Sequence, residues 1–467
     1  MEMKMQRHRF MIAIAAVLAG AVAASCGKSS SEGKDLTDSQ ILAKVPKDVV
    51  NTAYYKDVFV DGGCDLNSGI KVGNTYVNGK LPFALARCGF DKVEYFISSS
   101  ATGYGAGEVT LQNSIVAGND KDENGVLLYP DGQARFRLFY SFGGHSNDHG
   151  TTLGSLGRAR VNDFYAGGGS YVGSCAGAYL AGKYASGKQK NYYNIWAGGN
   201  MVATSVSNST IEIEMTSKTF QQYYGPADGT LVVGARHNGG GYMDSAGAPK
   251  GTEVIALYRN AEGKDSKYSG FYGKPAVWAY KESQASGRMV VTGSHPEDES
   301  AGDVYDLTSS MFKYAWDGAG CARVKHVLHN GQTVSMTKKT AESQPDNTAI
   351  GDLQCHHFVL YLPKGVPSLS VELQGSGDYD LSLYLKKGTF AFPEASPDYK
   401  SEEAGPRQMI QTGHLASGLW FVTVKCMSAV TATDTYIDEA GKKGRYFDYT
   451  GKTGVLNGVP YTVRASW

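Results

Sequence analysis

The sequence predicts a chain of two folded domains, an α/β domain built on a parallel sheet and then an antiparallel β-sandwich. The 467 residues are more than one hydrophobic core usually encloses. Across 51–318, apolar strand patterns alternate with helical patterns, which is typical of a parallel sheet. Across 319–467, short alternating strands separated by polar turns replace the helices, which indicates a β-sandwich.

The elements of the α/β domain follow from local patterns. The run Asp57–Asp61 is β-branched and aromatic and ends at two glycines, and a glycine also closes the helical run 81–89. Residues 99–133 are polar and glycine-rich and read as an insertion. The remaining predicted strands are 93–98, 134–142, 170–174, 211–215, 231–235, 253–258, 276–280 and 288–292, and the remaining helices are 153–166 and 304–316. In the second domain the clearest strands are 358–362, 369–373, 379–385 and 420–425.

The N-terminus has the pattern of an export signal. Basic residues precede the apolar run 10–23, which is too short for a typical membrane span and ends in small residues. The following Ala-Ser-Cys26-Gly resembles a bacterial lipobox, which predicts a signal peptide over 1–25, a lipidated Cys26 and a flexible tether over 26–50. The expected location is the cell envelope, at the outer membrane in a Gram-negative host. Cleavage after Ala23 and secretion is the alternative.

The stretch 171–182 has the sequence of a nucleophile elbow with cysteine as the nucleophile. Gly173-Ser-Cys175-Ala-Gly177 lies between a short apolar strand and a helical pattern, and small residues are needed where such a turn bends. A helix N-terminus beside Cys175 would stabilise a thiolate and lower its pKa. The alternative is a buried structural cysteine.

A cysteine nucleophile needs a base, a group that orients the base, and donors for the oxyanion. His295 and Glu297 follow the predicted strand 288–292, and on an extended segment their side chains would point the same way. Glu297 would then orient the imidazole of His295. The backbone N–H groups of Ala176 and of the loop containing Gly144 are the expected oxyanion donors.

These motifs resemble the class I glutamine amidotransferase-like superfamily. The closest resemblance is to the domain found at the N-terminus of some biotin–protein ligases, and it rests on Phe142–Gly144, Gly168–Tyr179, Asn238–Tyr242 and Gly293–Glu297. The resemblance implies a flavodoxin-like parallel sheet with helices on both faces and a Cys175–His295–Glu297 triad. Tyr179 stands where glutamine-hydrolysing members commonly have glutamine, so neither coupled glutaminase activity nor biotin transfer is expected.

The C-terminal region, from about His329 to Trp467, resembles the bacterial pre-peptidase C-terminal domain. The resemblance rests on 328–331, 377–383 and 417–424 and implies a β-sandwich of the kind appended to exported hydrolases. Asp378 and Asp380 have the carboxylates that calcium prefers, and a capped polar turn is the preferred interpretation.

The remaining candidates concern binding. Asn238, Tyr179 and His145 are the expected substrate-binding residues, although Asn238 equally suits a plain glycine-rich hairpin. His145, Asn147 and His149 match no strong metal signature and read as solvated loop residues, so no metal or cofactor is predicted.

The composition of the chain bears on the class of partner and on the expected disulfides. Lys+Arg and Asp+Glu both number 45, which argues against a nucleic-acid partner. Of the seven cysteines, Cys64 with Cys88 and Cys355 with Cys426 are the expected disulfides, because each pair falls within one predicted domain.

The leading hypothesis is therefore an exported, lipid-anchored hydrolase that uses Cys175 in amide or ester acyl transfer. The alternative is a catalytically silent surface protein that binds a peptide or glycan in the same pocket and on the sandwich. The identity of any small-molecule, peptide or glycan substrate is left open.

Overall fold

The computed structural model describes residues 36–62, 70–72, 75–77, 81–90, 92–97, 123–184, 191–224, 230–259, 270–338, 347–439 and 442–467. Residues 37–467 form one compact unit. The expected signal peptide, Cys26, Cys64 and most of the 99–133 insertion lie outside the described residues. Within the described residues, no helix has both the length and the apolar character needed to cross a membrane.

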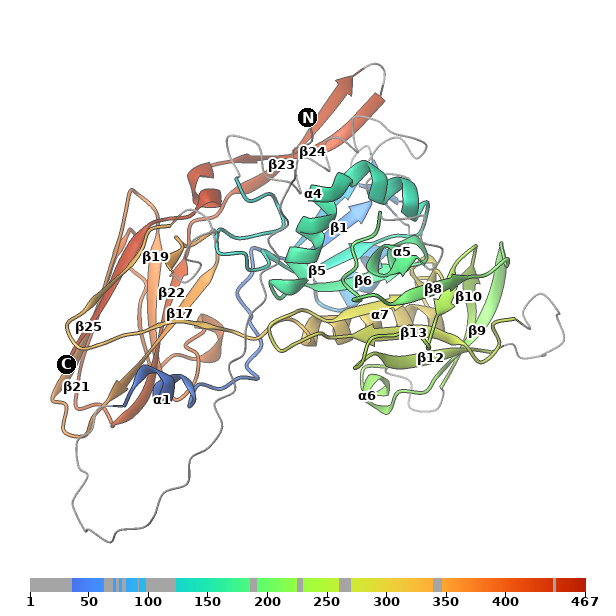
Figure 1. Ribbon diagram of the computed structural model, residues 1–467. Helices are drawn as coiled ribbons and strands as arrows, with labels where there is room; N and C mark the ends of the chain where they lie inside the picture. The colour runs from blue at the N-terminus through green and yellow to red at the C-terminus, as the bar shows by residue number, and fades with distance from the viewer. Residues whose placement is uncertain are drawn as a thin grey trace, which may run out of the picture. The chain divides into compact units, whose positions relative to one another are not determined.

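The centre of the fold is a nine-stranded sheet in the order β10-β9-β12-β13-β14-β6-β5-β1-β4 (Figure 1). The five strands from β14 to β4 run parallel to one another, whereas the four strands from β10 to β13 pair antiparallel with one another and β13 pairs antiparallel with β14. The bounds are β1 Lys56–Gly62, β4 Val93–Ile97, β5 Phe136–Ser141, β6 Ser170–Ser174, β9 Ser209–Met215, β10 Leu231–His237, β12 Glu253–Arg259, β13 Pro275–Tyr280 and β14 Met289–Thr292. The fold is thus mixed α/β, with the parallel strands in the half that carries Cys175.

Helices cover both faces of the parallel strands. Because side chains alternate along a strand, Phe139 and Tyr171 face one cluster that includes Phe164 of α4 (Ser146–Ala166), whereas Leu138 and Val172 face the other. The second cluster takes in α7 (Gly302–Asp317) and α2 (Leu81–Arg87), and the first takes in α5 (Ala176–Ala181). Figure 1 shows α4 and α7 on opposite faces of β5 and β6. This arrangement buries β5 and β6 completely.

The residues after α7 form two further sheets. One has the order β15-β17-β22-β19-β20, and its pairs are antiparallel except β15 with β17. The other is antiparallel with the order β16-β25-β18-β21. The bounds are β15 Val324–Val327, β16 Thr333–Met336, β17 Cys355–Leu362, β18 Ser368–Gly375, β19 Leu381–Lys387, β20 Tyr399–Ser401, β21 Arg407–Gly413, β22 Gly418–Cys426 and β25 Tyr461–Ser466.

Smaller elements complete the described chain. They are the sheet β11-β8-β7, two hairpins, two short α-helices and three 3-10 turns. Their bounds are β7 Lys183–Tyr184, β8 Asn200–Ala203, β11 Gly241–Met243, β2 Ile70–Val72, β3 Thr75–Val77, β23 Thr431–Glu439, β24 Lys442–Thr450, α1 Asp38–Leu42, α6 Lys218–Gln221, η2 Pro296–Asp298, η4 Pro393–Ala395 and η5 Thr453–Asn457.

The described part of the expected tether, 36–50, contains α1. This helix begins with a capping box in which the Thr37 side chain accepts from the Gln40 backbone N–H and the Gln40 side chain accepts from the Thr37 N–H. Ile41 is buried, and Val50 forms an isolated bridge with Cys321. These residues are therefore ordered, because the cap and one apolar side chain attach them to the folded unit.

Residues on both sides of the expected boundary near 318 contact one another through buried charges. The Arg135 guanidinium binds both carboxylate oxygens of Asp352, at 2.9 and 2.7 Å, and also donates to the Tyr449 hydroxyl at 2.9 Å. The Tyr129 hydroxyl donates to the Asp352 carbonyl at 2.9 Å. Arg135 and Asp352 are almost fully buried, so this contact is part of the protein interior.

The predicted disulfide between Cys355 and Cys426 is wrong. Both are free thiols, as is Cys88, whose thiol donates to the Ser309 carbonyl at 3.3 Å. Cys355 is in register with Lys425, so the side chain of the next residue, Cys426, points to the opposite face of the sheet. Two cysteines on opposite faces cannot be bridged without moving the backbone.

Candidate active site

The elbow is formed by the turn between β6 and α5. Cys175 has φ 47° and ψ −104° and is the residue immediately before α5. Such a conformation is unfavourable for a residue with a Cβ and is found where the surrounding structure imposes it.

The two glycines of the motif allow the close packing that imposes this turn. A Cβ on Gly173 would lie 2.6 Å from the carbonyl carbon of Gly177, and a Cβ on Gly177 would lie 2.3 Å from the carbonyl oxygen of Ser141 on β5. Side chains at either position would push α5 away from the sheet. The structure therefore accounts for the Gly-x-Cys-x-Gly spacing by steric contact.

His295 and Glu297 lie together beyond β14. The imidazole Nδ1 and the carboxylate Oε1 are 3.1 Å apart, and both side chains are buried. Because the carboxylate only accepts, Nδ1 carries the proton and Nε2 remains for another partner. The two side chains meet through η2, which begins at Pro296, and not through the extended segment that the sequence suggested.

The His295 imidazole also lies near Cys175, since a Cβ on Gly143 would lie 2.8 Å from Nδ1 of His295 and 3.2 Å from Cβ of Cys175. Burial lowers the pKa of His295, but the hydrogen bond to Glu297 and the effects of Glu297 and Cys175 outweigh burial and raise it to about 11. The Cys175 thiol also donates to the Asn238 backbone carbonyl, with a sulfur–oxygen distance of 3.7 Å. The imidazole is thus held in a form that can stabilise a thiolate.

Of the expected oxyanion donors, Ala176 directly follows Cys175, and Gly144 lines the same cavity as the thiol. Ala176 is the first residue of α5, where a backbone N–H has no acceptor within the helix. Gly144 has φ 146°, a conformation that favours glycine. A Cβ on the preceding Gly143 would lie 2.1 Å from Cε1 of His295 and 3.2 Å from Cβ of Cys175, so this loop runs against both catalytic candidates.

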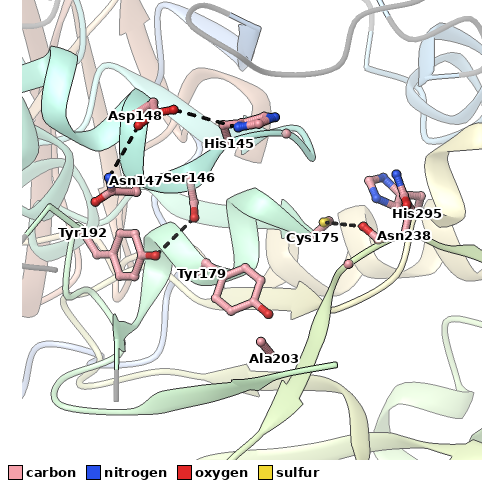
Figure 2. A pocket seen from close by; sticks show the side chains of 12 residues that line it. His145, Ser146, Asn147, Asp148, Cys175, Tyr179, Tyr192, Ala203, Asn238 and His295 are labelled. Carbon is pink, nitrogen blue, oxygen red and sulfur yellow. Dashed lines mark hydrogen bonds and ion pairs between the residues drawn. The ribbon is translucent and has the colours of Figure 1, made fainter. Parts of the chain in front are cut away.

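A cavity of about 430 Å³ opens onto Cys175 and His295 (Figure 2). It contains the three predicted substrate-binding residues His145, Tyr179 and Asn238, together with Gly144. The other lining residues were not among the predicted substrate-binding residues: Ser146, Asn147, Asp148, Tyr192, Ala203 and Gly239. Asp148 lies in the first turn of α4, shortly after the diglycine loop. Because acidic residues favour helix N-termini, Asp148 could have indicated that the helix begins here and carries these residues to the cavity.

The glycine-rich segment 238–242 lines this cavity because it packs against the end of β14. A Cβ on Gly240 would lie 1.7 Å from the Gly293 carbonyl oxygen, and Gly239 has φ 71°. The side-chain oxygen of Asn238 accepts from the Asn208 backbone N–H at 3.3 Å, which anchors the turn. The backbone carbonyl oxygen of Asn238 is thereby held beside the Cys175 thiol.

The interpretation of 145–149 as a solvated loop is wrong. α4 begins at Ser146, seven residues before the predicted start, and contains a kink at Gly154, whose φ is 67°. His149 is fully buried, and its Nε2 lies 2.9 Å from the Asp61 carboxylate at the end of β1. Only His145 is largely exposed. The long-range contact with Asp61 buries His149, and no local pattern indicates it.

In the part of the chain that the structure describes, no three His, Cys, Asp or Glu side chains are grouped so that they could hold a metal ion. At the turn before β19, Asp380 Oδ1 accepts from the Gly405 N–H at 2.8 Å, whereas Asp378 is exposed and pairs with Lys452.

No model of a known protein family matches the chain, and no curated protein matches it. Among solved structures, a glutamine amidotransferase is 14% identical, with 50% of this chain and 90% of that chain covered and a TM-score of 0.31. A putative ThuA-like protein from Bacteroides uniformis is 11% identical, with coverage of 57% and 93% and a TM-score of 0.33. The pre-peptidase C-terminal domain of a Bacillus anthracis collagenase is 7% identical, with coverage of 31% and 96% and a TM-score of 0.17.

Proposed function

We propose that the protein is a cysteine-dependent hydrolase that cleaves an amide or ester by acyl transfer to Cys175. The observation that carries the proposal is a buried group in which Glu297 hydrogen-bonds to His295, and His295 lines one cavity together with Cys175. A nucleophile, a base and a group that orients the base are the components of such a site.

The residues divide the work as follows. The thiolate of Cys175 attacks the acyl carbon, and the carbonyl oxygen becomes an oxyanion held by the backbone N–H groups of Ala176 and Gly144. The proton on His295 Nε2 passes to the leaving amine or alkoxide, which leaves a thioester on Cys175. His295 then removes a proton from water, the hydroxide adds to the thioester, and the acid product and free thiol are released. Glu297 holds the imidazole throughout.

The residues that line the cavity favour a substrate that is polar and carries no negative charge. Among the described residues that line the cavity there is no Lys or Arg, and the one carboxylate is Asp148. A carboxylate or phosphate on the substrate would therefore meet Asp148 with no lysine or arginine to compensate for it, because the charge of His295 is directed to Glu297 and Cys175. Ser146, Asn147 and Tyr192 offer hydrogen bonds instead.

The proposal extends to architecture and location. We infer that the α/β region has a flavodoxin-like amidotransferase-type fold and that the two C-terminal sheets are a sandwich of the pre-peptidase C-terminal type. The lipobox-like Cys26 supports a lipid anchor in the bacterial cell envelope, with secretion as the alternative. Mass spectrometry of the mature N-terminus distinguishes a diacylated Cys26 from an unmodified Ala24.

A second function is a silent binding protein for a peptide or glycan, and one contact favours it. Cys175 is only 5% exposed, and its donation to the Asn238 carbonyl stabilises the thiol and not the thiolate. In this case the cavity would hold a ligand without turnover.

Activity profiling of the purified protein against amide, ester and γ-glutamyl libraries separates the two functions. Hydrolysis that Cys175→Ala abolishes, and that His295→Ala reduces by about 100-fold or more, supports the hydrolase. Tight binding of a cavity ligand with no Cys175-dependent product supports the binding protein. Cys321→Ala is the matched control, because Cys321 is a partly exposed free thiol outside the cavity.

A further inference from the structure

We propose that Ser174 is a positioning residue for the His295 base, acting through Glu297, and that Tyr140 fixes the orientation of the Ser174 hydroxyl. This inference rests on the proposed function and adds two residues to it. Neither side chain lines the cavity among its described walls, so neither is expected to touch substrate.

The contacts form one continuous series. The Ser174 Oγ donates to Glu297 Oε1 at 2.7 Å, and the Tyr140 hydroxyl lies 3.0 Å from Ser174 Oγ. Glu297 Oε1 is also the atom that accepts from His295 Nδ1. The single hydroxyl proton of Ser174 is used on the carboxylate, so the Tyr140 O–H must donate to Ser174. The direction of every hydrogen bond in the series is therefore determined.

The series joins three adjacent strands of the parallel sheet. Tyr140 is on β5, Ser174 is the last residue of β6, and Ser174 is in register with Thr292, the last residue of β14. Glu297 follows β14 in η2. Ser174 thus connects the strand that delivers the nucleophile to the segment that delivers the base, one residue before Cys175.

Because the Ser174–Glu297 hydrogen bond is buried, its loss would affect the position of the Glu297 carboxylate. Tyr140, Ser174 and Glu297 are each 2% exposed, so water cannot readily replace a lost hydroxyl. Within the described chain, Glu297 Oε2 has no hydrogen-bond partner, and both of the carboxylate's bonds go to Oε1. Without Ser174, only His295 would hold the carboxylate, which could then rotate about its side-chain torsions.

The other groups around His295 do not replace this function. Cys175 faces it from the β6–α5 turn, and His237 on β10 lies near it with a pKa that burial and the charge of His295 lower to about 4, so His237 is neutral near pH 7. Arg236 and Asp298 pair with each other at 2.8 Å. Burial and the nearby Glu297 charge raise the pKa of Tyr140 well above its usual range, which keeps its hydroxyl a donor.

The test measures the titration of His295 by histidine side-chain NMR and the pH dependence of iodoacetamide labelling of Cys175, followed by peptide mass spectrometry. Ser174→Ala should lower the pKa of His295 and slow labelling near neutral pH by about tenfold, the effect of one hydrogen bond to a charged group. Tyr140→Phe should act in the same direction with a smaller effect. Ser170→Ala is the matched control, because this buried serine of β6 donates to the Ala315 carbonyl away from the site.

The outcomes separate the inference from the function on which it rests. If His295→Ala slows labelling of Cys175 but Ser174→Ala leaves both the labelling and the His295 titration unchanged, Ser174 has no positioning role and the inference is wrong. If His295→Ala itself leaves labelling unchanged, the catalytic proposal fails first. A Ser174→Ala effect that Ser170→Ala reproduces would be a general loss of packing and would also overturn the inference.

Discussion

Replacement of Gly143 by alanine tests the site with a single methyl group. The added Cβ would lie 2.1 Å from Cε1 and 2.8 Å from Nδ1 of His295, whereas ordinary van der Waals contact begins at about 3.4 Å. The imidazole would have to move by more than about 1 Å, and its 3.1 Å contact with Glu297 could not survive that movement. A misplacement of this size costs a catalytic group about 100-fold in rate.

The assay is the rate of iodoacetamide labelling of Cys175 near pH 7, with the other thiols of the same sample as internal references. Gly143→Ala should label about 100-fold more slowly, with an unchanged far-UV circular dichroism spectrum. Gly270→Ala is the control, since nothing lies within 4 Å of the Cβ that it adds. Wild-type labelling in Gly143→Ala, together with an unshifted His295 NMR signal, would show that the imidazole does not lie against this loop and would refute the reasoning.

Three further predictions concern charge. Arg135→Ala should lower the free energy of unfolding by about 3–5 kcal/mol in urea, because it leaves the buried Asp352 unpaired, whereas Arg160→Ala at an exposed pair should cost less than about 1 kcal/mol. Burial lowers the pKa of His357 to about 3, so the unfolded chain binds this proton first as the pH falls below about 6.5. His357 alone should therefore lower the free energy of unfolding by about 2 kcal/mol between pH 7 and 5, and His357→Asn should remove that share of the pH dependence, measured by urea melts at both pH values. Asp148→Asn removes a negative charge from the cavity, so labelling of Cys175 should become about threefold slower with cationic 2-bromoethylamine and faster with anionic iodoacetate, each relative to neutral iodoacetamide. Unchanged ratios of these labelling rates would show that the Asp148 charge does not act on the cavity.

Much of the parallel sheet could be predicted because its strands are buried on both faces. A strand covered on both sides lacks the usual alternation of polar and apolar residues, and β6 was predicted with the bounds that the structure has. The candidate triad was also found from sequence, since Cys175 and His295 follow strands whose carboxyl ends meet at one edge of the sheet. Local pattern and the direction of the strands were enough for these inferences.

The sequence was less informative where polar residues are buried by distant partners. His149 was predicted to be solvated, whereas Asp61 lies beside it in the interior, and no local pattern predicts that Arg135 pairs with Asp352. The same holds for Cys355, whose separation from Cys426 depends on the register of β17 and β22. Each of these contacts joins residues far apart in the chain, and no short-range pattern records them.

By itself, the sequence determined the order along the chain of the strands in the parallel core and the identity of the residues proposed to carry the chemistry. Periodicity and glycine spacing are local properties of a chain, and the glycine spacing around Cys175 was enough to predict the turn there. Only the tertiary structure decided that Asp148 and Tyr192 share the cavity, that η2 turns Glu297 toward His295, and that Ser174 holds Glu297 there. These features depend on distances between separate strands and helices, which the packing of buried side chains sets once the whole sheet has formed.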